Sequence, residues 1–272
     1  MDYKMIALDL DGTTLNSDGV LELETRRVLN CVKRKNIKII VCTGRIFGSA
    51  RYFSKELETD TWIVSSNGAF VAKYDMSDSI LSCEMDRELV EKTFSILEDS
   101  GVYYHFYDHI HYYTKEMTYR AKMYDKWNKS LNEEDRIVMS VIDNPIELIK
   151  NTNMPVYKIV VHDKDCELIS KLKSEIADLG LEVVSSIAES FDIMKKGATK
   201  GNALKCIADE MGIDREEIIA IGDNENDISM IEFAGLGVAV GNAELCLKEK
   251  ADLVIESNDN QGVAKFLRNL CS

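Results

Sequence analysis

Several features that mark other classes of protein are scarce or absent in this 272-residue sequence. Proline occurs only twice, and no low-complexity segment or internal repeat stands out, so little of the chain can be a disordered linker. The longest charge-free apolar stretch covers about eleven residues, at 233–243, which is well short of the roughly 20 that a membrane-spanning helix needs. No signal peptide is visible. We therefore expect a soluble cytoplasmic protein, without a membrane partner, of one large or two modest domains.

Basic residues and paired cysteines are also in short supply. The 33 Lys and Arg residues face 47 Asp and Glu residues, which gives a formal net charge of −14. Because phosphate backbones are held by clustered Lys and Arg, we expect no nucleic-acid partner. The seven cysteines contain no C-x-x-C pair, and we interpret them as free thiols, mostly buried.

The first part of the chain alternates between strand and helix patterns. Short apolar runs at 4–8, 37–42 and 62–65 are typical of buried strands, and amphipathic segments at 22–35 and 46–57 predict helices between them. An Asn-Gly turn then leads into a short hairpin-like strand. This alternation is the pattern of a parallel sheet with helices on its faces.

The pattern changes at about residue 83. A helix is predicted at 86–99, and aromatic-rich runs at 102–107 and 111–114 suit adjacent strands in an antiparallel style. The strand and helix alternation resumes with the apolar run at 191–194, and a closing helix is expected at 260–270. The sequence therefore predicts a core formed by residues 1–82 and 190–272, and a second domain at 83–189 inserted into it.

Two carboxylates close the opening strand, since Asp9 and Asp11 directly follow an apolar run. Residues two apart in an extended chain point to the same side, so these like charges would lie within several ångströms of each other. A cation should then sit between them. A hard divalent ion such as Mg²⁺ is the natural candidate, because it prefers carboxylate and carbonyl oxygens.

Other polar groups follow later strands or open a helix: Thr43-Gly44, Lys200, and the acidic segment 223–227. Ligands of open α/β sheets bind outside the carboxyl ends of the strands, so we expect these groups to gather there. Together they supply carboxylates for a metal, and a lysine, a hydroxyl and N–H groups for an anion. This inventory fits phosphoryl transfer, which depends on positioning and charge neutralisation.

The same segments carry a resemblance to a known family. Asp9-Leu10-Asp11-Gly12-Thr13, Thr43-Gly44-Arg45, Lys200 and the segment 222–227 resemble, in this order, the four motifs of the haloacid dehalogenase superfamily. Ser66-Asn67-Gly68-Ala69 and the large insertion after it resemble more narrowly the Cof-type sugar-phosphate phosphatases. The resemblance runs the length of the chain. It implies an α/β fold, with a Rossmann-like doubly wound parallel-sheet core and an inserted α+β cap domain that closes over the site and selects the substrate.

The resemblance also implies a role for each motif residue. Asp9 would be the nucleophile that forms an aspartyl-phosphate, and Asp11 would be the acid and then the base, for which its pKa must rise above the ordinary value. The expected magnesium ligands are the Asp9 side chain, the Asp11 backbone carbonyl, Asp223 and, directly or close by, Asp227. The expected phosphate-binding groups are the amides of Leu10 and Gly44, with Thr43, Lys200 and Asn226. Lys200 is preferred over its neighbours Lys195 and Lys196 because it opens an apolar helix, as in the family motif.

The function predicted from these residues is a Mg²⁺-dependent phosphatase of small phosphorylated metabolites, with sugar phosphates as the expected substrates. Two alternatives stay open at this point: phosphoryl transfer between sugar positions, as in mutases, and a non-catalytic sensor of a phosphorylated ligand. Intact Asp9 and Asp11 speak against the sensor, because a pure binder needs no nucleophile. We expect a monomer or a weak homo-oligomer.

Overall fold

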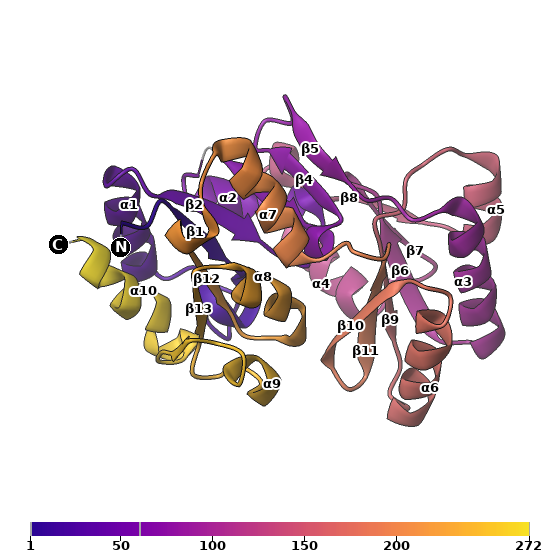
Figure 1. Cartoon of the computed structure of the whole chain (residues 1–272). Helices are drawn as coiled ribbons and strands as arrows, with labels where there is room; N and C mark the ends of the chain where they lie inside the picture. Colours follow the sequence, from indigo (N-terminus) through magenta and orange to yellow (C-terminus); the bar gives the residue numbers. More distant parts are fainter. Residues whose placement is uncertain (1, 60, 272) are drawn as a thin grey trace. The chain divides into compact units, whose positions relative to one another are not determined.

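The computed structural model describes residues 2–59 and 61–271, and the chain divides into two compact units (Figure 1). The described residues of 1–45, 50–81 and 199–272 form the first unit. Those of 46–49 and 82–198 form the second unit. The first unit is thus discontinuous in sequence. Along the chain, nearly all residues of the second unit lie between residues 81 and 199 of the first unit.

An eight-stranded sheet in the order β14-β13-β12-β1-β2-β3-β4-β5 forms the centre of the first unit. Neighbouring strands from β14 to β3 run parallel, whereas β4 is antiparallel to β3. The strands are β1 Met5–Leu8, β2 Lys38–Cys42, β3 Trp62–Ser65, β4 Phe70–Lys73, β5 Ser79–Ser82, β12 Ile218–Gly222, β13 Leu236–Ala239 and β14 Leu253–Val254. All four residues of β1 have no exposed surface, as the uninterrupted apolar run predicts for a central strand covered on both faces.

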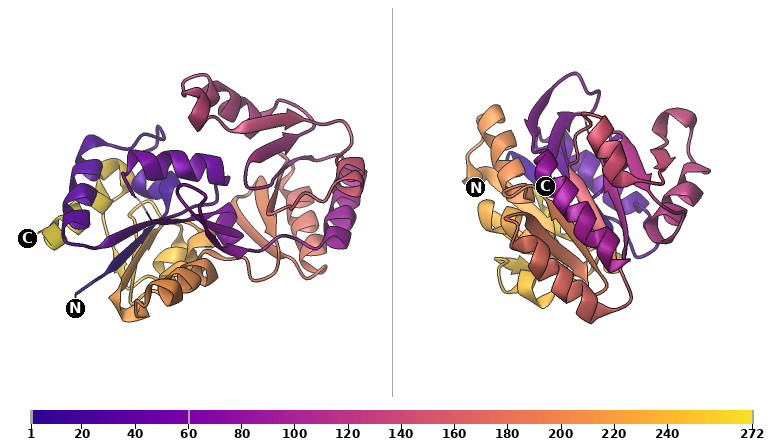
Figure 2. Two further views of the ribbon diagram at one scale, coloured as in Figure 1. Left: turned by 90° about the horizontal axis from the view of Figure 1, so that it is seen from above. Right: turned by 90° about the vertical axis from the view of Figure 1, so that its right-hand side faces the viewer.

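Helices cover both faces of this sheet. Figures 1 and 2 show α7 and α8 on one face and α1 and α2 on the other. In α1 the buried positions are 25, 28, 29 and 32, which is the spacing of one helical face. The helices are α1 Leu23–Arg34, α2 Phe47–Glu56, α7 Lys200–Met211, α8 Ile228–Phe233, α9 Leu245–Lys248 and α10 Gly262–Leu267. The predicted doubly wound α/β core is confirmed.

The second unit is built on a six-stranded sheet in the order β10-β11-β9-β6-β7-β8. The described pairs are antiparallel, except for parallel β7 and β8. Its strands are β6 Tyr103–Tyr107, β7 His111–Thr114, β8 Val138–Val141, β9 Lys158–His162, β10 Glu182–Ile187 and β11 Ser190–Met194, and its helices are α3 Arg87–Ser100, α4 Tyr119–Asn128, α5 Pro145–Asn151 and α6 Cys166–Ala177. Residues of α3, α5 and α6 pack with alternate residues of β6, β9 and β11 in one hydrophobic cluster.

Two parts of the second unit differ from the sequence predictions. The strand at 191–194 was expected to resume the core, but β11 pairs with β9 and β10 in the six-stranded sheet, and the first unit resumes only at Thr199. No helix or strand is predicted for the segment between β7 and β9, yet it forms α4, β8 and α5. In α4 only Ala121 and Tyr124 are buried, so its apolar pattern is weak, whereas β8 lies in the apolar run 137–142 and yet contains no buried residue.

The prediction of mostly buried cysteines is wrong. All seven are free, but only Cys42, in β2, is buried, whereas Cys166 and Cys246 are exposed and the other four are half-buried. Cysteine is commonly buried in proteins, but here most thiols lie at helix surfaces. Among the described residues, no helix is long and apolar enough to span a bilayer.

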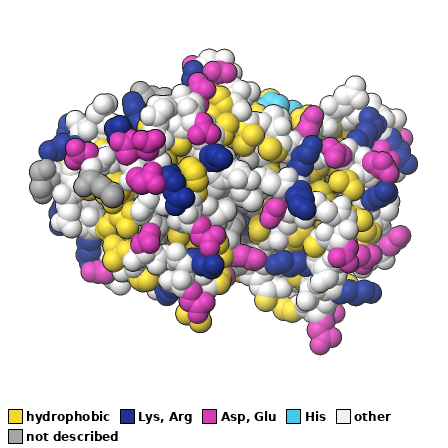
Figure 3. Space-filling view, viewed as in Figure 1, with side chains coloured by type: hydrophobic (Ala, Val, Ile, Leu, Met, Phe, Trp, Pro, Cys, Tyr) yellow, Lys and Arg dark blue, Asp and Glu magenta, His cyan; other side chains and the backbone are white. Residues whose placement is uncertain are grey.

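Charges of both signs are interspersed on the surface. On the face drawn in Figure 3, basic and acidic side chains alternate over short distances. Exposed ion pairs of the described chain include Lys250 with Glu232 at 2.9 Å and Lys92 with Glu88 at 2.9 Å. Water and salt screen exposed pairs of this kind, so they add little to the stability of the fold.

Candidate active site

Asp9 occupies the position directly after β1, at the carboxyl end of the central strand. Its backbone N–H donates to Ile221 O in β12 at 3.0 Å, and its own carbonyl accepts from Thr14 Oγ1 at 2.6 Å. The chain turns sharply through Leu10–Thr14, where Gly12 has a φ of +78°. A Cβ at Gly12 would lie 2.4 Å from Asp223 Oδ2, so only glycine lets this turn approach the neighbouring strand end.

Three carboxylates and one lysine meet at this strand end. Asp9, Asp223 and Asp227 each present an oxygen within 4.8 Å of the others. Lys200 Nζ donates to Asp9 Oδ1 at 2.6 Å and to Asp227 Oδ1 at 2.5 Å, and the lysine side chain is fully buried. Lys200 is the first residue of α7, so the helix start places its ammonium among the carboxylates.

Burial dominates the electrostatics of this cluster. It raises the pKa of Asp9 well above the ordinary value, with Lys200 opposing the shift and Asp227 and Asp223 adding to it. Burial, reinforced by Asp227, likewise raises the pKa of Asp223 to about 7. Burial alone would lower the pKa of Lys200, but Asp227 and Asp9 outweigh it and raise the pKa. Ionisation of all three carboxylates would therefore place more negative charge in the cluster than the Lys200 ammonium alone offsets, which favours a further cation.

Asp227 organises the loop that follows β12. Its Oδ2 accepts from the backbone N–H of Asp223 at 2.9 Å and of Asn224 at 3.1 Å, and its side chain is fully buried. The second oxygen, Oδ1, accepts from Lys200. Thr13 also holds the Asp223 side chain in place, because its Oγ1 donates a hydrogen bond to Asp223 Oδ1 at 2.8 Å. Both oxygens of Asp227 are thus engaged by the protein, while Asp223 is held from the side of the Leu10–Thr14 turn.

Asp11 lies differently from the prediction. The strand ends at Leu8 and Asp11 sits in the following turn, so the alternation that would place it beside Asp9 does not apply. Its carboxylate is 53% exposed and is bound by Arg45, with Nε to Oδ2 at 2.7 Å and a terminal nitrogen to Oδ1 at 2.5 Å. The guanidinium also stacks over Phe53 at 4.6 Å. The cations nearest the two carboxylates are therefore different: Lys200 at Asp9 and Arg45 at Asp11.

A set of hydrogen bonds through Asn67 connects Thr43 with Asn226, two of the predicted phosphate-binding residues. Thr43, buried after β2, accepts at Oγ1 from Arg45 N at 3.2 Å, and its carbonyl accepts from Asn67 N at 3.1 Å. Asn226 Nδ2 donates to Asn67 Oδ1 at 3.0 Å. Leu10 and Gly44, whose amides were predicted to bind phosphate, directly follow Asp9 and Thr43 in these two turns.

The sequence interpretation gave no role to three residues that hold this constellation: Thr13, Arg45 and Asn67. Each lies inside a motif that was quoted for its neighbours. The signals were present, since Thr13 follows the Asp-Gly turn and Arg45 follows Thr43-Gly44. Their partners could not be read from the sequence, because the contacts join strand ends that lie far apart along the chain.

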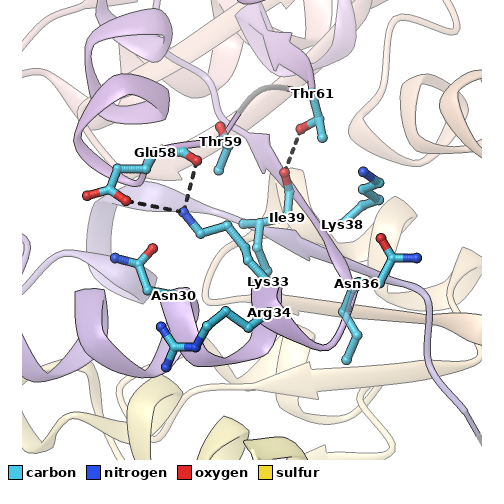
Figure 4. Close-up of a pocket in the computed structure, with 10 residues that line it drawn as sticks. Asn30, Lys33, Arg34, Asn36, Lys38, Ile39, Glu58, Thr59 and Thr61 are labelled. Carbon is cyan, nitrogen blue, oxygen red and sulfur yellow. Dashed lines mark hydrogen bonds and ion pairs between the residues drawn. The ribbon is translucent and has the colours of Figure 1, made fainter.

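A pocket in the first unit lies elsewhere and carries no comparable chemistry (Figure 4). This pocket of about 480 Å³ lies beside the amino-terminal end of β2, whereas Asp9 and Asp223 follow the carboxyl ends of their strands. Its Lys33 ammonium donates to the carbonyls of Leu57 at 2.6 Å and Glu58 at 2.9 Å, and so ties α1 to the end of α2. The carboxylate cluster, and not this pocket, is the candidate active site.

Comparisons with known proteins agree over nearly the whole chain. Residues 6–267 match the family of haloacid dehalogenase-like hydrolases. The phosphatase YwpJ of Bacillus subtilis is 31% identical over 98% of this chain and 99% of its own, and the pyridoxal phosphate phosphatase YbhA of Escherichia coli is 30% identical over 98% of both chains. A solved haloacid dehalogenase-like hydrolase from B. subtilis superposes with a TM-score of 0.85 at 30% identity, over 98% of this chain and 99% of that one.

Proposed function

Because the chain belongs to the haloacid dehalogenase-like hydrolases, we propose that it is a Mg²⁺-dependent phosphatase of small phosphorylated metabolites, with sugar phosphates as the first candidates. The observation that carries the proposal is the cluster of Asp9, Asp223 and Asp227 around the buried Lys200 ammonium. A nucleophile, a metal-binding set and a fixed cation lie within one site, as phosphoryl transfer requires.

In the proposed reaction Asp9 attacks the phosphorus atom and the bond from phosphorus to the leaving oxygen breaks. Asp11 gives its proton to that oxygen, so the alcohol leaves neutral and an aspartyl-phosphate remains. Asp11 then takes a proton from water, the water oxygen attacks phosphorus, and Asp9 and inorganic phosphate are released. The Asp11 carboxylate is exposed in the Leu10–Thr14 turn, which suits a group that must reach the leaving oxygen.

The proposed phosphate-binding groups are the Thr43 hydroxyl, the amides of Leu10 and Gly44, the Lys200 ammonium and the Asn226 carboxamide. Two sets of hydrogen bonds support this assignment. One joins Lys200 to Asp9, and the other joins Thr43 to Asn226 through Asn67. Lys200 neutralises charge beside the nucleophile, because its ammonium already lies 2.6 Å from Asp9.

The donor set fits magnesium, since the cluster offers carboxylate oxygens and no sulfur or imidazole among the described residues. We propose Asp9, Asp223 and the Asp11 carbonyl as its ligands. Asp227 belongs to the same cluster, but its two oxygens already serve Lys200 and two amides, which favours a supporting role. When bound, Mg²⁺ would neutralise charge that develops on the phosphoryl oxygens.

The second unit, which comprises residues 46–49 and 82–198, is proposed as the cap that selects the substrate. The name of one relative specifies pyridoxal phosphate, so a phosphorylated cofactor is a second substrate class to examine beside sugar phosphates. A cytoplasmic location and a monomeric or weakly associated state stay predictions.

The decisive experiment incubates the purified protein and Mg²⁺ with a generic aryl phosphate and then with a panel of sugar phosphates and phosphorylated cofactors. A phosphatase releases inorganic phosphate from at least one of them. A mutase would instead return an isomeric sugar phosphate without net phosphate release. A sensor would bind a panel member without converting it, and either result would contradict the proposal.

Asp223→Ala should raise the Mg²⁺ concentration needed for half-maximal activity by about 10-fold or more, because one carboxylate is lost from the metal-binding set. Asp214→Ala, which changes an aspartate in the loop before β12, is the matched control. The measurement is a Mg²⁺ titration of aryl phosphate hydrolysis. A titration identical to that of the wild type would remove Asp223 from the metal site.

Magnesium should stabilise the protein more at about pH 8 than at about pH 6, because a metal competes with protons for raised-pKa carboxylates. Burial raises the pKa of Asp223 to about 7, and the deprotonation of Asp223 as the pH rises through that value removes stability that Mg²⁺ restores. The melting temperature is measured with EDTA and with MgCl₂ at both pH values. An equal shift at both would contradict the electrostatic account.

A further inference from the structure

The turn between β3 and β4 adopts a backbone conformation that few side chains favour. Ser66, Asn67 and Gly68 have consecutive φ values of +49°, +58° and +98°, all in the left-handed region. Ser66 and Asn67 are each only 2% exposed. Such conformations persist where the surroundings enforce them, and they concentrate at functional sites.

The surroundings of this turn are two of the segments that carry the proposed phosphate-binding groups. Ser66 N donates to Arg45 O at 2.9 Å, and Asn67 N donates to Thr43 O at 3.1 Å. On the other side, a Cβ at Gly68 would lie 2.2 Å from the carbonyl oxygen of Thr199, the residue before Lys200. The turn therefore packs closely between the end of β2 and the start of α7.

The Asn67 side chain reaches a third such group. Its Oδ1 accepts from Asn226 Nδ2 at 3.0 Å. A carboxamide nitrogen has two hydrogens in one plane, so fixing one of them orients the other. The oxygen of Asn67 therefore determines the direction in which Asn226 can donate its second hydrogen.

We propose that Asn67 is a positioning residue for the phosphoryl group, acting through the carboxamide of Asn226 and the backbone of Thr43. This inference rests on the proposed phosphatase function and adds a residue to which no role was given. Asparagine combines two properties at this position. It tolerates a left-handed backbone better than most residues, and its acceptor oxygen carries no charge that would repel a phosphoryl dianion.

Asn67→Gly tests the proposal, because glycine accepts φ +58° and removes only the side chain. The affinity for inorganic phosphate, measured by calorimetry in MgCl₂, should fall about 10-fold, the expected loss for a hydrogen bond to a charged group. The melting temperature should fall only slightly, because relief of the left-handed backbone offsets part of the lost side-chain contact. An unchanged phosphate affinity with a lowered melting temperature would mean that Asn67 is only structural.

The matched control is Asn36→Gly. Asn36 is also left-handed, at φ +63°, but it is exposed and lines the pocket at the opposite end of β2 (Figure 4). Its phosphate affinity should equal that of the wild type. A fall comparable to that in Asn67→Gly would show that the loss is not specific to the turn and would overturn the proposal.

A double-mutant cycle then asks whether Asn67 acts through Asn226. Asn67→Gly combined with Asn226→Ala should bind phosphate about as weakly as Asn226→Ala alone, whereas fully additive losses would overturn the proposed route. Asn67→Asp keeps the acceptor and adds a negative charge, so it should bind phosphate more weakly than Asn67→Gly. If the wild type binds phosphate but hydrolyses no ester, the proposed function fails while the cycle still tests Asn67. If it binds no phosphate at all, the positioning role fails with it.

Discussion

Asp9→Asn is expected to lower the rate of Mg²⁺-dependent aryl phosphate hydrolysis by a factor on the order of 10⁴ or more, because a carboxamide cannot form the covalent intermediate. The fold should survive the change. Burial already raises the pKa of Asp9, so the neutral side chain suits its surroundings, and the carboxamide oxygen can still accept from Lys200. The rate is measured as release of the aryl alcohol.

The control for this variant is Asp18→Asn, the same chemical change at an exposed aspartate in the loop that follows the Leu10–Thr14 turn. Its rate and circular dichroism spectrum should match those of the wild type. Asp9→Asn should also fail to incorporate phosphate when it is quenched with acid during turnover. Undiminished turnover in Asp9→Asn would refute the proposed mechanism.

Lys200→Met is expected to cause the largest loss of stability. The ammonium lies 2.6 Å from Asp9 and 2.5 Å from Asp227 with no exposed surface, and removing one partner of a buried ion pair typically costs about 3–5 kcal/mol. The loss should shrink at about pH 5.5, because burial raises the pKa of Asp9 and this carboxyl can then take up a proton instead. Thermal unfolding at about pH 8 and pH 5.5 measures both effects.

Lys196→Met is the matched control, since Lys196 is exposed and lies four residues before Lys200. Its melting temperature should stay within about 1–2 °C of the wild type, as for most surface substitutions. A Lys200→Met protein as stable as the wild type at about pH 8 would mean that the carboxylates are compensated by another route.

Much of the candidate site could be predicted because several of its residues directly follow the carboxyl ends of parallel strands. Asp9 and Asp223 directly follow β1 and β12, which are hydrogen-bonded neighbours, so the rule that polar groups gather at carboxyl ends places them together. Lys200 could be chosen over Lys196 because it opens an apolar helix, and the structure buries its ammonium beside Asp9. These predictions depend only on strand positions and not on side-chain detail.

The predictions that failed depended on local geometry or on remote partners. Asp11 was placed by strand alternation, but the strand had already ended at Leu8. The strand at 191–194 has the same apolar pattern in either sheet, so only its pairing with β9 decides where it belongs. Arg45 and Asn67 act through partners that lie 34 and 159 residues away, and no spacing rule brings such pairs together.

The position of β1 in the middle of the sheet has a consequence during synthesis on the ribosome. One neighbour, β2, follows β1 within about thirty residues, but the other, β12, begins 210 residues after the end of β1. At roughly 5–20 residues per second, one edge of this fully apolar strand stays unpaired for about 10–40 seconds while the chain up to β12, which includes the second unit, is translated. An open apolar edge is a template for pairing with other chains. Slow translation of a 50-residue stretch within 82–198 should therefore lower the yield of folded protein more than slow translation of residues 223–272.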